Sequence, residues 1–400
     1  MINLAFFLFF IRIISISLLP NIAGMINIAG FIGFTSLTVV WYLWRSDFYY
    51  LKKYVIYEIC LILILFVSIF ISSFNGLIFS DSIEAFLKFF IIFSSLNLGL
   101  LCGKKIERNA YFKVIYYSLF THVLLGILLS KFGFVHEVHG VERITGISGG
   151  VQIYANLISF LFVLSYYLIF YKVNFISRNF LIIAIITCIL AFAMSNTLKN
   201  FAVSILVISI PYLFNKKKFF KFLLFSLFIL IPLVVVSFPY LKELSLFERI
   251  QSIYDAGLST QLAPGEKLES SLIWRLIHWK LLLIDWFENY FFFGSGVGQS
   301  VNMNALVTAN GNGFEAHSDI VTFVVEFGLV LTPIIVFMMF YPLYNSCKLA
   351  LSNKDDITIC VLFAFLSSFI ASFFGNVFYS LANIYYLWFF VGWTLGRNGK

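Results

Sequence analysis

The chain has 400 residues, of which 61% are hydrophobic, 20% are aromatic and only 12% are charged. A soluble domain is about half apolar and about a quarter charged, so this composition excludes a water-soluble enzyme, and its high hydrophobicity excludes disorder. The net charge of +8 is typical of Lys and Arg that set membrane topology, and we do not expect a nucleic-acid partner.

The apolar runs are long and continuous, which argues against a membrane barrel, whose strands alternate over short stretches. The sequence therefore predicts an all-α polytopic membrane protein, with residues 1–400 forming one integral membrane domain in the lipid bilayer. A membrane-spanning helix needs about 20 mainly apolar residues. In chain order we expect twelve spans, at residues 3–19, 22–44, 54–72, 82–102, 111–130, 153–171, 180–195, 201–214, 222–239, 318–341, 357–376 and 380–396.

Basic residues gather in alternate connections between these spans. The connections after spans two, four, six, eight and ten and the C-terminal tail carry Arg45, Lys52, Lys53, Lys104, Lys105, Arg108, Lys172, Arg178, Lys216, Lys217, Lys218, Lys221, Lys348, Lys354, Arg397 and Lys400. The opposite short connections hold only Lys131, Arg143 and Lys199. By the positive-inside rule, both termini are cytoplasmic and the other connections lie outside.

Two outer connections are candidates for the active region. Residues 131–152 form a small outer loop, and residues 240–317 form a large outer loop between spans nine and ten. A connection of that length is usually functional or disordered. Because it holds Trp274, Trp279 and Trp286, we expect the large loop to be ordered and functional.

Residues 268–290 of the large loop have helical periodicity. Arg275, His278, Asp285 and Asn289 fall on one wedge of a helix whose remainder is largely apolar, which predicts an amphipathic helix at the membrane interface. The wedge is either a solvated stripe on a packing helix or a face that directs Arg275 into a polar cavity. The glycines of Gly294–Gly298 follow no strand, which favours a flexible turn over a nucleotide loop.

His317 stands where the large loop enters span ten, with Asp319 beside it and Glu326 inside the same span. An ionisable group within a span is by default a functional hypothesis, and the alternative is a purely structural pairing. Arg143 precedes span six, and a guanidinium grips phosphate with two parallel hydrogen bonds. We expect Arg249 and Lys199 to add positive charge near Arg143 and Arg275.

No metal or cofactor is expected. The five cysteines are scattered without metal-ligand spacing. His136 and His139 are three residues apart, but Gly140 follows them and no third ligand is near, so this pair is a weak metal candidate.

Three segments of the chain resemble the O-antigen ligase/polymerase superfamily of bacterial surface-polysaccharide assembly. They are Arg143-Ile-Thr-Gly146, then Arg275-x3-Trp279 followed by Gly294-x-Gly296-x-Gly298, and then Ala316-His317-Ser-Asp-x6-Glu326-Phe-Gly328. The long outer loop late in the chain also fits the family layout. Two features depart from it: Lys199 stands where members often have a Ser-Arg pair, and the glycine turn lacks its usual preceding proline.

The resemblance implies a metal-independent, inverting glycosyltransferase that uses undecaprenyl-diphosphate-linked sugars on the periplasmic face. In this interpretation Arg143 and Arg275 hold the donor diphosphate, and His317 takes the proton from the acceptor hydroxyl. The other residues expected to contact the substrate are Arg249, Lys199, Glu326, Asp319 and His278. The resemblance also implies a bacterial inner membrane, with the two outer loops in the periplasm.

We expect an O-antigen polymerase, which joins lipid-linked repeat units, with a chain-length regulator as a candidate partner. One alternative is an O-antigen ligase, which transfers finished glycan to lipid A-core. The other is a transporter or flippase of lipid-linked glycan, although transporters tend to place ionisable groups near the membrane midplane.

Overall fold

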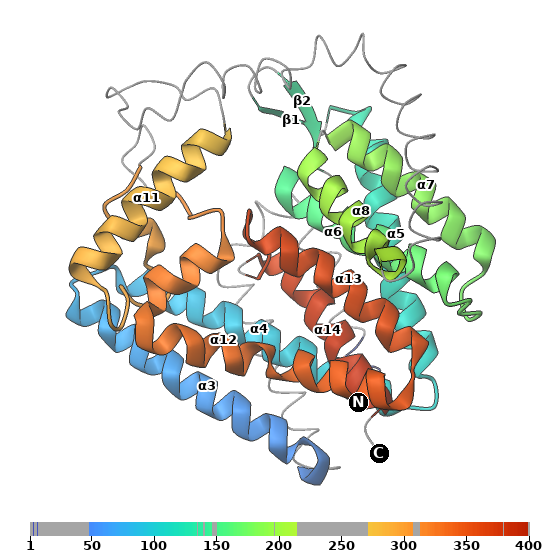
Figure 1. Ribbon diagram of the computed structural model, residues 1–400, viewed down its shortest axis with the longest axis horizontal. Helices are drawn as coiled ribbons and strands as arrows, with labels where there is room; N and C mark the ends of the chain where they lie inside the picture. The colour runs from blue at the N-terminus through green and yellow to red at the C-terminus, as the bar shows by residue number, and fades with distance from the viewer. Residues whose placement is uncertain are drawn as a thin grey trace.

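The computed structural model describes residues 3, 6, 48–133, 135–138, 141–145, 150–195, 197–213, 271–306, 313–378 and 380–398. Apart from residues 3 and 6, the spans expected at 3–19, 22–44 and 222–239 lie outside these residues, and so does Arg249. Within the described ranges the chain is mainly helical, with the helices packed into one bundle (Figure 1).

The helices coincide with nine of the expected spans, and a tenth helix lies within residues 268–290; that it sits at the membrane interface stays a prediction. Their bounds are α3 Phe48–Phe74, α4 Phe79–Lys104, α5 Arg108–Ser130, α6 Val151–Phe170, α7 Arg178–Ser195, α8 Leu198–Leu213, α11 Ser271–Asn289, α12 Asp319–Asn353, α13 Asp356–Ser372 and α14 Leu381–Asn398, with a 3-10 turn η2 at Ser300–Asn302. In the described part of the chain, six helices are long and apolar enough to cross a membrane: α3 from Ile56, α4, α5, α6, α7 and α12. Helices α8 and α13 are apolar but shorter. The prediction of a multi-pass helical protein is confirmed to this extent, and the full number of twelve spans stays a prediction.

Helices α4 and α14 form the closest pair in the bundle. Gly99 and Gly103 of α4 face Gly392 and Gly396 of α14, and a Cβ atom at any of the four would overlap a backbone carbonyl of the partner helix. Small residues four apart let two membrane helices approach until their backbones touch, which gains van der Waals contact that lipid cannot replace. This pair joins an early helix to the last one.

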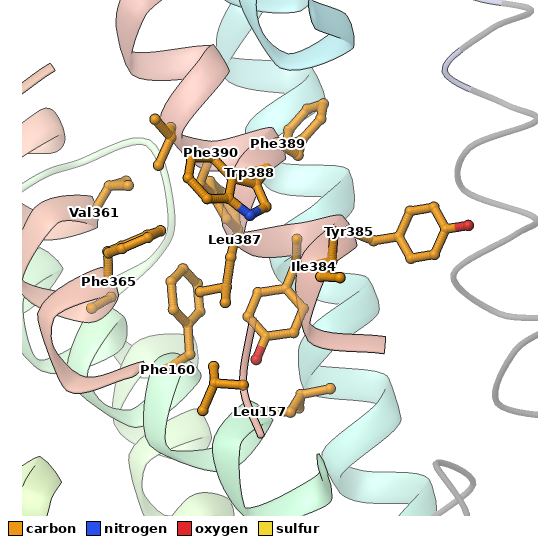
Figure 2. Packing of buried hydrophobic residues seen from close by; sticks show 14 of the residues in the cluster. Leu157, Phe160, Val361, Phe365, Ile384, Tyr385, Leu387, Trp388, Phe389 and Phe390 are labelled. Atoms are coloured by element: carbon orange, nitrogen blue, oxygen red, sulfur yellow. The ribbon is translucent and has the colours of Figure 1, made fainter. Parts of the chain in front are cut away.

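Aromatic side chains fill the space around α14. Figure 2 shows Phe160 of α6, Phe365 of α13 and Trp388 of α14 packed in one cluster, and all three are almost fully buried. The Phe365 and Trp388 ring centroids lie 5.8 Å apart, and Phe160 stacks on Phe390 at 5.4 Å. Such rings contribute large contact areas and favourable edge and offset geometries. They fix how α6, α13 and α14 sit around each other.

The connections gather at two opposite ends of the bundle. At one, the basic end, Arg397 of α14 pairs with Asp355 at 3.0 Å, and Trp393 donates to the Arg108 carbonyl at 2.9 Å. At the other, the site end, Gln299 donates to the Ile78 carbonyl at 2.7 Å. Alternate connections therefore share an end, as a chain that crosses a layer repeatedly requires. Which end faces the cytoplasm stays a prediction.

One element departs from the all-α expectation. Strands β1 Val135–Val138 and β2 Val141–Ile144 pair antiparallel, with Val138 opposite Val141, so two residues connect them (Figure 1). Valine and isoleucine favour strands, and a two-residue connection is the commonest in hairpins. His136 lies in β1, so it lacks the helical geometry that the weak metal candidate assumed, and His139 lies outside the described residues.

Candidate functional site

Helix α12 is broken near its start, and the break shapes the site. Gly328 has φ 65° and ψ −174°, which interrupts the helix two and a half turns from Asp319. The segment after α11 supplies the missing hydrogen bonds, since Leu329 donates to the Phe291 carbonyl at 2.9 Å and Val330 to the Phe292 carbonyl at 3.0 Å. A Cβ on Gly328 would overlap the backbone of this segment, so only glycine fits there.

The glycine turn wraps around the carboxylate of Glu326. The Glu326 side chain is buried, and its Oε2 accepts from the Gly298 N–H at 2.9 Å. Its Oε1 accepts from the Ser300 N–H at 3.2 Å and from the Ser300 hydroxyl at 2.8 Å. Gly294, Gly296 and Gly298 all have positive φ, which lets the turn fold this tightly. The turn is therefore an ordered part of the bundle, where the sequence predicted a flexible one, and Glu326 holds it from within.

Asp319 ties the start of α12 to the connection between α13 and α14. It is buried, and its Oδ2 accepts from the N–H groups of Val377 and Phe378, both at 2.8 Å. Ser318 caps the same helix by accepting from the Val321 N–H at 3.4 Å. The contacts of Asp319 are those of a side chain that fixes two backbone segments against each other.

His317 is held in place by helix α11. Its backbone has φ 51°, a left-handed conformation that few non-glycine residues adopt. The Trp274 ring lies 5.4 Å from the His317 ring, and Trp279 donates its indole N–H to the Ala316 carbonyl. Backbone strain of this kind persists where the surroundings over-determine it, and such places are often functional.

His278 supports the same segment from one turn further along α11. It is fully buried and stacks on Trp274, with the ring centroids 4.9 Å apart. Its Nε2 lies 3.2 Å from the Phe314 carbonyl, and because a carbonyl only accepts, Nε2 carries the proton. Burial lowers the pKa of His278 to about 4, so this imidazole is neutral. Its position is typical of a packing residue rather than of one open to substrate.

His317 lies in the field of two cations. Burial lowers its pKa first, Arg275 lowers it further, Glu315 opposes them, and Lys199 adds to the lowering. The structure thus brings Arg275, Lys199 and His317 close enough to interact electrostatically, although they come from three separate segments. Burial also lowers the pKa of Arg275, but a guanidinium starts so high that it stays charged.

Lys199, on the first turn of α8, is anchored by neutral groups. Its Nζ donates to Gln152 Oε1 at 3.1 Å and to the Phe374 carbonyl at 2.8 Å. Asn156 supports this arrangement from one turn below Gln152, because its Oδ1 accepts from Gln152 at 3.1 Å and from Asn200 at 2.7 Å. This polar ladder was not predicted from the sequence. Its signal was an amide pair four residues apart inside an otherwise apolar span.

Residues 181–337 match the family model described as O-antigen ligase. This matched segment is less than half of the 400-residue chain. It includes Lys199, Arg275, His317 and Glu326 and confirms the resemblance to the O-antigen ligase/polymerase superfamily. The family implies a lipid-linked glycan as substrate and a chain embedded in a membrane. A search of curated proteins finds no matching relative.

Arg143 lies before the matched segment in sequence. It is in strand β2, which pairs with β1 and packs mainly on α5 and α7, and its side chain is partly buried. Arg275 and His317 instead lie on α11 and on the segment before α12. That Arg143 joins these two residues stays a prediction, and Arg249 lies outside the described residues.

Proposed function

We propose that the protein is a metal-independent, inverting glycosyltransferase that joins undecaprenyl-diphosphate-linked repeat units on the periplasmic face of the bacterial inner membrane, as an O-antigen polymerase does. One observation carries the proposal: two basic side chains, Arg275 and Lys199, act electrostatically on a partly buried imidazole, His317, within the segment that matches the O-antigen ligase model. This combination suits a reaction that expels an anion and removes a proton.

The cations fit the leaving group. Among the described residues, Arg275 Nε is buried without a hydrogen-bond partner, and Lys199 Nζ donates to two neutral oxygen atoms. A diphosphate would supply the missing acceptors and the compensating charge. Negative charge grows on the diphosphate as the glycosidic bond breaks, so fixed cations there stabilise the transition state more than the ground state. We assign Arg143 and Arg249 to the same diphosphate.

His317 fits the role of general base. Because its pKa is lowered, its imidazole is neutral at neutral pH and can accept a proton. In the proposed step the acceptor hydroxyl oxygen bonds to the anomeric carbon, the bond from that carbon to the phosphate oxygen breaks, and the hydroxyl proton moves to His317. The diphosphate departs with the electron pair, and a single displacement inverts the anomeric centre.

We assign positioning roles to the three remaining candidates. Glu326 holds the glycine turn, Asp319 holds the connection between α13 and α14, and His278 holds residues 314–317. Each acts through hydrogen bonds to backbone that leads to the site.

Purified protein tests the proposal when it is incubated with a defined lipid-diphosphate repeat unit, without metal or nucleotide. We expect a ladder of extended products from the wild type and none from Arg275→Gln or His317→Asn, since asparagine tolerates the left-handed backbone. Glu288→Gln, an exposed change on α11, should extend normally. A ladder of normal length from either site variant counts against the assignment, and extension by the wild type excludes pure transport.

The ligase alternative has its own support, because the matching family model is described as O-antigen ligase. The phenotype of a deletion strain separates the two. Core carrying a single repeat unit indicates a lost polymerase. Bare core with accumulated lipid-linked polymer indicates a lost ligase.

A further inference from the structure

A second region of the site end is a polar cavity of about 700 Å³. It lies between the first turns of α4, the segment after the glycine turn and the start of α12. Its size falls within the range of about 300–1,000 Å³ that small-molecule sites occupy. Neither Arg275 nor His317 lines it, so it is distinct from the cationic cluster.

The lining of this cavity is acidic and amide-rich. Asp81 and Glu84 of α4 line it together with Glu315, and Lys88, which pairs with Glu84 at 3.2 Å, is its cation among the described residues. Asn302 lines it as well and donates to Asp81 at 2.9 Å. Carboxylates repel a diphosphate, and a lipid tail would leave these polar groups without partners. Hydroxyl-rich sugars, in contrast, donate and accept hydrogen bonds in all directions.

Asn376 provides a second, independent observation. It lines the cavity and donates to the Glu315 carboxylate, but among the described residues its buried Oδ1 has no hydrogen-bond partner. A buried carbonyl oxygen of this kind is costly unless it is matched by a donor. A small rotation of the Asn376 side chain would let a ligand hydroxyl in the cavity supply that donor.

The cavity borders the cationic cluster through Glu315 and Asn376. Glu315 acts electrostatically on His317, two residues later in the chain. Asn376 follows Gly375, and a Cβ on that glycine would contact both Gln152 and Lys199 Nζ. A sugar in the cavity would therefore lie next to the proposed diphosphate site without sharing its charge.

We propose that this cavity binds the uncharged sugars of the acceptor glycan, which lets one of their hydroxyl groups reach His317. That the bound glycan is the acceptor rests on the proposed function. The binding of a glycan in this cavity does not depend on it. The two regions carry opposite charge and therefore bind different groups. The cations bind the diphosphate of the donor, and the carboxylates and amides bind the sugars of the acceptor.

The test uses the free repeat-unit oligosaccharide, released by mild acid from the lipid-linked precursor of the producing strain. Binding to the detergent-solubilised full chain is measured by isothermal titration. Ala305→Trp fills the cavity and should weaken binding at least tenfold, and Glu315→Gln, which keeps the side-chain shape, should weaken it severalfold. Ala110→Trp, on an exposed site at the basic end, should bind as the wild type does.

The outcomes separate this inference from the proposed function. Failure of the wild type to bind the oligosaccharide, or equal binding by wild type, Ala305→Trp and Glu315→Gln, overturns the inference even if chain extension is observed. Binding that these two variants weaken supports a glycan site even if no extension occurs, in which case the proposed function fails alone. Where extension occurs, the inference further requires Ala305→Trp to raise KM for the acceptor and to leave the binding of inorganic pyrophosphate unchanged.

Discussion

The carboxylate of Glu326 accepts a hydrogen bond from the backbone N–H of Gly298, 28 residues earlier in the chain, at 2.9 Å. This contact joins the broken helix α12 to the glycine turn that follows α11. A turn with three glycines of positive φ presents several N–H groups to one side, a form that elsewhere binds anions. Here the Glu326 carboxylate takes the place of a bound anion. We call this carboxylate and the turn around it the clasp, and its role is structural.

Removal of this clasp should destabilise the protein. In Glu326→Ala the Gly298 and Ser300 donors stay buried without an acceptor. In Glu326→Gln the side-chain N–H₂ replaces one of the two acceptor oxygens and so meets these donors with another donor. Each buried unmatched donor costs about 1–3 kcal/mol, so we expect both variants to lower the thermal unfolding midpoint. Intrinsic fluorescence of the solubilised protein measures it, with Glu288→Gln as the exposed control. Equal midpoints in all four proteins would show that the clasp carries no stability.

Arg275 and Lys280 lie on the same helix, so variants of the two compare a cation of the candidate site with a cation of the exposed surface. Arg275→Lys keeps the charge but loses the two-pronged grip, and we expect kcat/KM for the lipid donor to fall about tenfold. Arg275→Gln should cost roughly a hundredfold, because a hydrogen bond to a charged group contributes about 1.5–3 kcal/mol. Lys280 is exposed, and Lys280→Gln should leave the donor kinetics unchanged. Equal activity in Arg275→Lys and Arg275→Gln would exclude a role for the retained charge.

The pH dependence of kcat/KM should report His317. Catalysis needs the neutral imidazole, so activity falls as the pH drops through the pKa of His317, which lies below the ordinary 6.5. Lys199→Gln removes a cation that lowers this pKa, so the acid limb should move to higher pH. Glu315→Gln removes the opposing anion, so the limb should move to lower pH. A limb that stays fixed in both variants would mean that another group controls it.

The glycine face between α4 and α14 should tolerate no added methyl group. A Cβ on Gly392 would overlap the Leu96 carbonyl, whereas a Cβ on Gly150 would meet only the flexible end of Ile153, at 3.4 Å. Overpacking of a tight core costs about 1–3 kcal/mol. Gly392→Ala should therefore lower the yield of folded, monodisperse protein and its unfolding midpoint, and Gly150→Ala should not. A normal midpoint for Gly392→Ala would show that the two helices can separate freely.

Local patterns predicted the helices well, because each span is a continuous apolar run and α11 has a clear helical period. His317 and Arg275 lie within the segment that matches the family model, and their roles stay predictions. The pairing of Glu326 with Gly298 and of Lys199 with Gln152 depends on how distant segments pack, which no local pattern reports. The hairpin at 135–144 was missed because four-residue strands give a weak signal beside long helices.

Three of the candidate site residues illustrate the same limit. Glu326, Asp319 and His278 were expected to contact substrate because they are ionisable and close in sequence to other candidates. In the structure each of them has a polar atom that bonds to backbone, but Glu326 also lines the polar cavity, and whether any of the three contacts substrate stays a prediction. Sequence identifies where polar groups are, but only packing decides whether they meet the protein or a ligand.

The contact between Gly99 and Gly392 has a consequence for biogenesis. Nearly three hundred residues separate the two, and at about 5–20 residues per second the ribosome takes on the order of 15 to 60 s to synthesise that stretch. Throughout that interval the bare groove of α4 can meet only lipid or another nascent chain. A stop codon before residue 381 would remove α14 and leave the glycine face of α4 permanently without its partner helix. Even a short C-terminal truncation of this kind should make the product a substrate of quality-control proteases.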